Sequence, residues 1–167
     1  MNDSTEHQDE IAKLVQQHGA VPPPWFMFLK VHPYDICWRR GAGESYIMVY
    51  STWWEQQKEQ LDEKQRIDYF RKWPPPPEWL IWMIEAIWDL NPVDFEDDDD
   101  YWPYFRRTKA LGFGSEDDYK NAMRDEAATI EKNGTPHWGK WEWTWVSKTN
   151  RKCSSLVQIY SIGYRNV

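Results

Sequence analysis

The sequence is poor in cysteine and has no long uninterrupted hydrophobic run. Its two cysteines, Cys37 and Cys153, lie far apart in the chain. A secreted disulfide framework or a cysteine-based zinc site needs more cysteines at closer spacing. The polar, acidic start MNDSTEHQDE lacks the basic and apolar parts of a signal peptide. No stretch approaches the roughly 20 apolar residues that span a bilayer. We therefore expect a cytoplasmic protein with free thiols and no membrane partner.

Positive charge is also scarce relative to negative charge. The chain contains 20 Lys and Arg against 27 Asp and Glu, which gives a net charge of −7. Direct nucleic-acid binding normally requires clustered Lys and Arg to hold phosphates, so this balance argues against it. It favours a basic protein as partner. The length of 167 residues suits a single globular domain over residues 1–167.

Catalytic and metal-binding signatures are missing as well. There is no GxSxG elbow, HExxH helix, CxxC pair or phosphate-binding loop, and the four histidines lack metal-ligand spacing. Cys37 follows His32 by five residues, which is more typical of a buried thiol near a histidine than of a nucleophile and its base. We predict no catalytic residue, metal or cofactor. An enzyme of unrecognised type stays open as an alternative.

Tryptophan and proline are abundant instead. The chain has 13 tryptophans, and in RKWPPPPEWLIWMIEAIWDLNP, residues 71–92, four prolines lead into a tryptophan-rich stretch. Pro77 suits a first helical turn because its missing N–H removes no intrahelical bond, and Asn91-Pro92 marks the end. Apolar residues on nearly every side predict a buried central helix. Glu85 and Asp89 share one narrow stripe, where we expect a solvated edge rather than an acid–base pair.

The other segments predict an α+β fold, mostly helical, with a tryptophan-rich C-terminal β-hairpin or small antiparallel sheet. Helices are expected over 4–18, 44–60, 62–73 and 115–134. Residues 26–31, in VPPPWFMFLKV, fit either a strand or a short helix. In WGKWEWTWV, three tryptophans two residues apart, Trp141, Trp143 and Trp145, would share one strand face, and SLVQIYSIGY would return as the second strand.

The main functional hypothesis concerns the acidic loop around 94–100 and the aromatic cluster YWPYF that follows. The run lacks the glycine and the alternation of an EF-hand, and a merely solvated loop is the plain alternative. Charge would steer a basic partner and an exposed tryptophan would anchor it. Trp38, Trp102 and Trp138 lie outside clear core positions. The predicted partner-binding residues are Asp97, Asp98, Asp99, Asp100, Tyr101, Trp102 and Tyr104.

A second candidate is the connection CWRRGAGESY at residues 37–46. Two arginines and two glycines before a helix could hold an anion or a carboxylate. The alternative is a turn whose arginines pair with acidic residues of the chain. The residues of this possible ligand or anion site are Arg39, Arg40, Gly41, Gly43 and Glu44.

Together these features predict a non-catalytic acidic binding protein that neutralises or inhibits a basic protein partner, such as a toxin or nuclease. Bacterial immunity proteins and nuclease inhibitors are of this type, although no family motif connects this chain to them. A carbohydrate or small-ligand module with an aromatic platform is the alternative. The row at 141–145 is its candidate platform, although the same alternation suits a strand packed on the core, which we favour. A structural subunit of a larger assembly also stays open.

Overall fold

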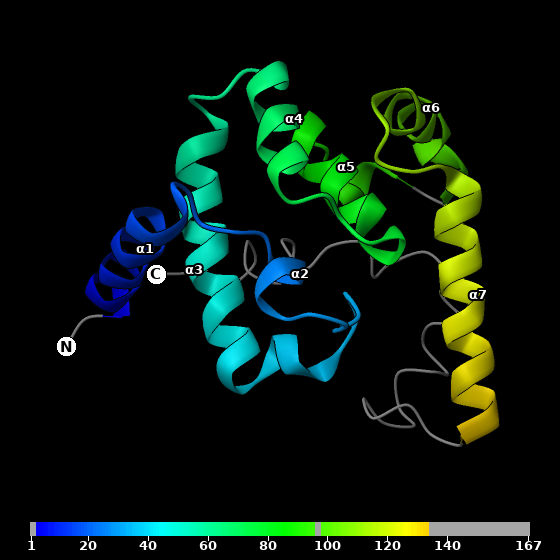
Figure 1. Ribbon diagram of the computed structural model, residues 1–167, viewed down its shortest axis with the longest axis horizontal. Coiled ribbons are helices and arrows are strands. Elements are labelled where there is room, and N and C mark those ends of the chain that lie inside the picture. Colours follow the sequence, from blue (N-terminus) through cyan, green and yellow to red (C-terminus); the bar gives the residue numbers. More distant parts are fainter. Residues whose placement is uncertain (1–2, 96–97, 134–167) are drawn as a thin grey trace. The chain divides into compact units, whose positions relative to one another are not determined.

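The computed structural model describes residues 3–95 and 98–133, and this part of the chain is helical (Figure 1). It contains seven α-helices, four short 3-10 helices and no strand within those ranges. The predicted α+β class is therefore wrong for the described part. The predicted C-terminal hairpin lies outside the described residues. Two compact units, Met1–Trp73 and Pro74–Val167, divide the chain at the proline run, and the expectation of one domain over the whole chain stays a prediction.

The first unit is organised around the long helix α3 (Gly41–Lys58). Helix α1 (Asp3–His18), the short helix α2 (Pro24–Met27) and the 3-10 helix η1 (Ile36–Arg39) pack against it. Helix α1 buries Ile11 and Leu14 and ends at Gly19, whose φ of 81° suits glycine. This confirms the helix predicted over residues 4–18.

Residues 26–31 belong to a short helix and the turn after it, not to a strand. Helix α2 begins with Pro24 at its first position, after Pro23 in extended conformation. A proline has no N–H to give to a sheet but suits the first turn of a helix. The preceding segment is held by tyrosines, because the Tyr46 and Tyr69 hydroxyls each donate a 2.7 Å hydrogen bond, to the Pro22 and Val21 carbonyls respectively.

Aromatic rings fill the contact between α3 and α4 (Glu63–Lys72). Trp54 of α3 lies 5.2 Å from Tyr69 and 5.4 Å from Phe70 of α4, measured between ring centroids. Helix α4 starts at the predicted cap, where the Asp62 carboxylate accepts from the Gln65 N–H at 2.8 Å and the Gln65 amide oxygen accepts from the Asp62 N–H at 2.9 Å. Such reciprocal bonds satisfy two N–H groups that a helix start leaves unpaired.

The second unit contains the predicted central helix. The prolines lead into the 3-10 turn η2 (Pro77–Trp79) and then into α5 (Leu80–Trp88), in which nearly every side chain is buried. The helix ends at Asp89, which adopts a left-handed conformation with φ 51°. The prediction of a buried helix is confirmed. The prediction of a solvated edge is wrong for Glu85, which is only 6% exposed.

The remaining described elements are η3 (Pro92–Asp94), η4 (Asp98–Tyr101), α6 (Trp102–Leu111) and α7 (Glu116–Asn133). The start of α7 confirms the predicted cap, since the Ser115 N–H donates to the Asp118 carboxylate at 2.7 Å and the Asp118 N–H donates to the Ser115 hydroxyl at 3.3 Å. Helix α6 was not predicted. None of the helices in the described ranges combines the length and apolar character that crossing a membrane requires.

Candidate functional site

The two described ends of the acidic run are held together by a ring stack. The rings of Phe95 and Tyr101 lie 4.4 Å apart between centroids, at an angle of 18°. Tyr101 is 1% exposed and directly precedes α6. An offset stack of this kind adds about 0.5–1.5 kcal/mol to the burial of the two rings. The stack therefore fixes where the acidic run leaves the fold and where it returns.

A buried hydrogen bond anchors the same point to α5. The Tyr101 hydroxyl donates to Glu85 Oε1 at 2.6 Å. Burial raises the pKa of Glu85 well above its ordinary value of 4.5, and the hydrogen bond from Tyr101 offsets part of that rise. The protonated carboxyl is favoured because a charged carboxylate is costly to remove from water. Glu85 is thus a buried carboxyl whose neutral form is favoured by burial and whose oxygen accepts from Tyr101.

Trp102 follows this anchor and faces solvent. It is 51% exposed, and the Arg106 guanidinium lies 4.9 Å from its ring centroid. Arg106 lies one turn of α6 after Trp102, and its guanidinium lies over the indole. Such a cation–π interaction contributes about 0.5–1 kcal/mol at an exposed site. The remaining exposed part of the indole is a large apolar surface directly beside the acidic run.

The other predicted residues of this surface have different surroundings. Asp100 is exposed, whereas Asp97 lies outside the described residues, and of Asp98 and Asp99 only the backbone is described, in η4. Tyr104 is half-buried and lies 5.3 Å from Trp88 between ring centroids. The surface available to a partner therefore includes Asp100 and Trp102. Tyr101 is buried between them in the chain and holds the end of the acidic run in place.

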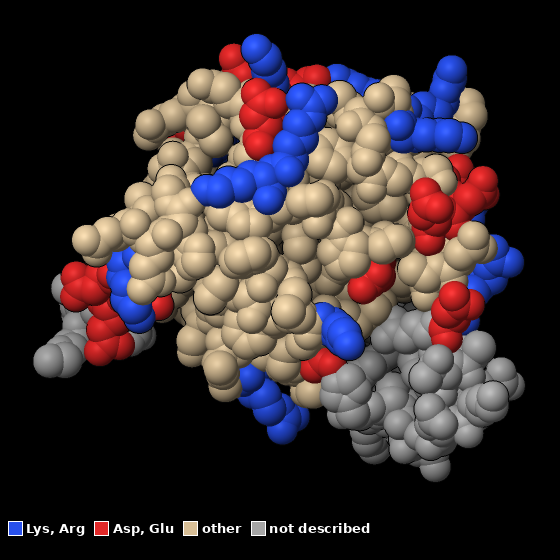
Figure 2. Space-filling model, viewed as in Figure 1, with Lys and Arg blue, Asp and Glu red and all other residues tan. Residues whose placement is uncertain are grey.

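More acidic side chains lie in the same unit. Figure 2 shows acidic groups along α7, whose first turn contains Glu116, Asp117 and Asp118. Helices α6 and α7 pack against each other. The hydrogen bonds from the Ser115 hydroxyl and N–H lower the pKa of Asp118, which favours its charged form at neutral pH. The negative charge of this unit thus extends beyond the run itself.

The sequence pointed to Trp102 through its position, but it did not single out Phe95 or Arg106, and it placed Glu85 on a solvated edge. Phe95 could have been found as an aromatic residue at the opposite end of the acidic run from Tyr101. Arg106 could have been found from its spacing of four residues from Trp102, which places the two side chains on one helix face. For Glu85 no local signal exists, because its partner is distant in sequence.

The second candidate, residues 37–46, joins η1 to α3. Arg39, Arg40 and Gly41 are exposed, and Gly41 has φ 71°. Gly43 is buried, and a Cβ placed on it would lie 2.4 Å from the Cys37 carbonyl oxygen. Glu44 lies in the first turn of α3 and is half-buried. The glycines are therefore explained by a turn and a close backbone approach, without any ligand.

Cys37 in this connection is a free thiol that its surroundings do not activate. Partial burial and the neighbouring Asp35 carboxylate raise its pKa to about 11, so the nucleophilic thiolate is rare at neutral pH. Trp38 beside it is 1% exposed and its indole donates to the His32 carbonyl at 2.8 Å. The expectation that Trp38 lies outside the core is wrong, and Trp138 lies outside the described residues.

No known protein family, curated protein or solved structure matches the chain. Within residues 3–95 and 98–133, no three His, Cys, Asp or Glu side chains are grouped so that they could hold a metal ion. The surface around Asp100 and Trp102 must therefore be interpreted from its own chemistry.

Proposed function

We propose that the protein is a non-catalytic binding protein that uses the surface around residues 94–105 to hold a basic protein partner. The observation that supports this most directly is Trp102, an indole 51% exposed at the end of an acidic run. Exposed tryptophans are costly to leave in water and are frequent anchors of protein interfaces. Carboxylates beside the anchor supply long-range attraction to a positive surface.

The anchor below the surface supports the same proposal. The stack of Phe95 on Tyr101 and the bond from Tyr101 to Glu85 fix the base of the run before any partner arrives. A preorganised surface loses less conformational entropy on binding than a mobile one, and affinity rises accordingly. Two supports that hold the ends of the run in place suit a recognition surface better than a loop with no role in binding.

Arg106 sets a condition on how the partner binds. Its guanidinium already lies over the Trp102 ring, so a cation from the partner must either displace it or use another part of the exposed indole. An apolar partner side chain meets no such competition. We therefore propose that the partner places apolar side chains on Trp102 and its Lys or Arg side chains on the carboxylates.

Inhibition follows from this mode of binding if the partner's positive surface is its active surface. A nuclease or a nucleic-acid-directed toxin concentrates Lys and Arg where phosphates bind. Carboxylates that occupy those positions exclude the substrate by charge and by volume. The alternative of a carbohydrate platform at residues 141–145 lies outside the described residues.

The test begins with affinity capture from the native host, using the full chain as bait. Association and dissociation rates of the captured partner are then measured by surface plasmon resonance at low and high salt. Trp102→Ala should mainly accelerate dissociation, by a factor that corresponds to about 2 kcal/mol for a hot spot. Replacement of Asp97–Asp100 by asparagine should slow association and reduce its salt dependence.

Leu29→Ala is the matched control for the tryptophan variant. Leu29 is 75% exposed and belongs to the first unit, so its loss removes exposed apolar surface without touching residues 94–105. Partner binding should be unchanged in this variant. If the tryptophan and aspartate variants keep their fold and both bind like the wild type, the partner uses another surface and the proposal fails.

A further inference from the structure

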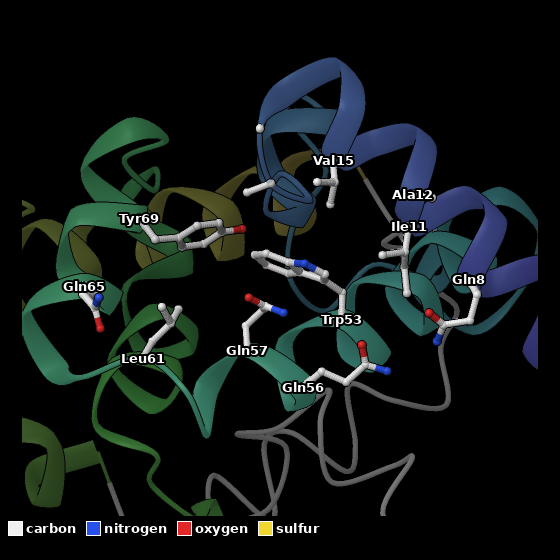
Figure 3. Close-up of a pocket in the computed structure, with 12 residues that line it drawn as sticks. Gln8, Ile11, Ala12, Val15, Trp53, Gln56, Gln57, Leu61, Gln65 and Tyr69 are labelled. Carbon is white, nitrogen blue, oxygen red and sulfur yellow. The ribbon is translucent and has the colours of Figure 1, made fainter.

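A pocket in the first unit is formed by helices α1, α3 and α4 (Figure 3). Its volume is about 540 Å³, within the range of about 300–1,000 Å³ that small-molecule sites occupy. Twelve residues line it, and none carries a charge: Gln8, Ile11, Ala12, Val15, Gly19, Ala20, Trp53, Gln56, Gln57, Leu61, Gln65 and Tyr69. In a chain of which 28% is charged, an uncharged lining of this size is a specific property of the site.

The base of the pocket is apolar and aromatic. Ile11 and Trp53 are almost fully buried, whereas Val15 at the rim is 36% exposed. The rings of Trp53 and Tyr69 lie 5.5 Å apart between centroids, and Figure 3 shows the indole of Trp53 in the centre, pointing toward Tyr69. The Tyr69 hydroxyl is engaged with the Val21 carbonyl, which leaves the ring itself as lining. A flat apolar group fits such a base.

Glutamine amides supply the polar part of the lining. Figure 3 shows Gln57 below Trp53, with Gln8 and Gln56 near each other at one end. Each amide offers both a donor and an acceptor, so it pairs with hydroxyl and amide groups without requiring a charge. Gln65 contributes less because its oxygen already accepts from the Asp62 N–H. A ligand with a net charge would lose hydration here and find no counter-ion among the lining residues.

We propose that this pocket binds a small uncharged molecule that combines an apolar ring face with hydroxyl or amide groups. Two sources share this chemistry, namely neutral sugars and aromatic amides. The ring face lies on Trp53 and the aliphatic side chains around it, and the polar groups pair with Gln57 and its neighbours. This site belongs to the first unit, and it is independent of the surface around Trp102 in the second.

The experiment uses two matched sets of probes and saturation-transfer NMR on the full chain. The sugar set is N-acetylglucosamine, glucosamine and glucuronate, and the aromatic set is phenylacetamide, phenethylamine and phenylacetate. Each set keeps one ring type and contains a neutral, a cationic and an anionic member. In at least one set the neutral member should bind about tenfold more tightly than both charged members, because those must be desolvated and no lining residue supplies a counter-ion. The Lys72 ammonium beside Gly19 is already bonded to the His18 carbonyl. The set that binds identifies the source.

Two variants locate the binding. Ala12→Phe places a ring in the pocket from an exposed position of α1 and should weaken the neutral probe by about tenfold or more. Gln16→Phe adds the same ring to an exposed position that does not line the pocket, and it should leave binding unchanged. Gln57→Glu keeps the shape of the side chain and adds a charge, so it should shift the preference toward the cationic member of the set.

Three results would overturn the proposal. The first is that no member of either set binds. The second is that the charged members bind the wild type as tightly as the neutral ones. The third is that Ala12→Phe, folded as judged by circular dichroism, binds the neutral probe like the wild type. Trp102→Ala should not alter probe binding. The small-molecule proposal and the protein-binding proposal are therefore tested by different variants, and one can fail without the other.

Discussion

The Tyr101 hydroxyl and the Glu85 carboxyl form a 2.6 Å hydrogen bond between two buried side chains that lie 16 residues apart. Tyr101 closes the acidic run, and Glu85 lies in the middle of α5. The bond therefore connects the end of the acidic run to α5, in which nearly every side chain is buried, and its loss can be measured as a change in stability.

Tyr101→Phe should lower the free energy of unfolding by about 1–3 kcal/mol, because Glu85 loses a buried partner. The stack on Phe95 should persist, since phenylalanine keeps the ring. Urea denaturation measures the change. A double-mutant cycle with Glu85→Ala isolates the contribution of the pair, and a coupling energy near zero would show that the bond does not stabilise the fold.

Glu85→Gln should change how stability depends on pH. The folded-state pKa of Glu85 is raised by burial, whereas the unfolded value is 4.5, so the folded state retains a proton that the unfolded state releases. Wild-type stability should fall as pH rises from about 4.5 toward the raised pKa. Glutamine has no proton to lose, so the variant should gain stability relative to the wild type across that window. Urea unfolding at several pH values gives the free energy of unfolding of both proteins as a function of pH. If this reasoning is wrong, the wild-type and variant curves will run parallel across that window.

Gly43→Ala should be strongly destabilising, by about 2 kcal/mol or more. The added Cβ would lie 2.4 Å from the Cys37 carbonyl oxygen and 2.9 Å from its carbon, both backbone atoms. Gly41→Ala is the control: nothing lies within 4 Å of its Cβ, and only the left-handed φ of 71° opposes it, at about 1–2 kcal/mol. The melting temperature of Gly43→Ala should be lower than that of Gly41→Ala. The reverse order would contradict the close approach of Gly43 to the Cys37 backbone.

Cys37 should react slowly with iodoacetamide at neutral pH, because burial and then the Asp35 carboxylate raise its pKa to about 11. Asp35→Asn removes the negative charge but keeps an oxygen that can accept from the Cys37 N–H, as Asp35 does at 2.8 Å. The rate of alkylation should therefore rise. Mass spectrometry in a Cys153→Ser background follows this thiol alone, and an unchanged rate would mean that Asp35 does not control it.

The central helix could be predicted from the sequence because its signals are local. A proline at the first turn, apolar residues on nearly all sides and Asn91-Pro92 at the end all act within one segment. Glu85 was misplaced for the opposite reason. Helical spacing groups it with Asp89, but Asp89 is an exposed left-handed end residue, whereas Glu85 is covered by Tyr101 from a later element. Only the tertiary structure reveals that partner.

The two candidate sites differ in the same way. The exposed position of Trp102 could be expected because dense negative charge keeps the adjoining segment near water, although the same reasoning fails for Tyr101, which is 1% exposed. The pocket could not be found in this manner, because its lining comes from three helices and the turns beside them, between Gln8 and Tyr69. The spacing of four residues between Trp53 and Gln57 predicts that both lie on one face of α3. It does not predict that α1 and α4 leave a space beside that face.

The ring stack of Phe95 on Tyr101 has a consequence for how this protein can diverge. A segment whose two ends are pinned can change in length at a small entropic cost, about 0.6 kcal/mol for each doubling. Substitutions and insertions in the part of the acidic run before η4 should therefore leave α5 and α6 little affected, provided that both rings are kept. Selection can then vary the number of carboxylates in this segment to suit a new partner without rebuilding the helices that carry it.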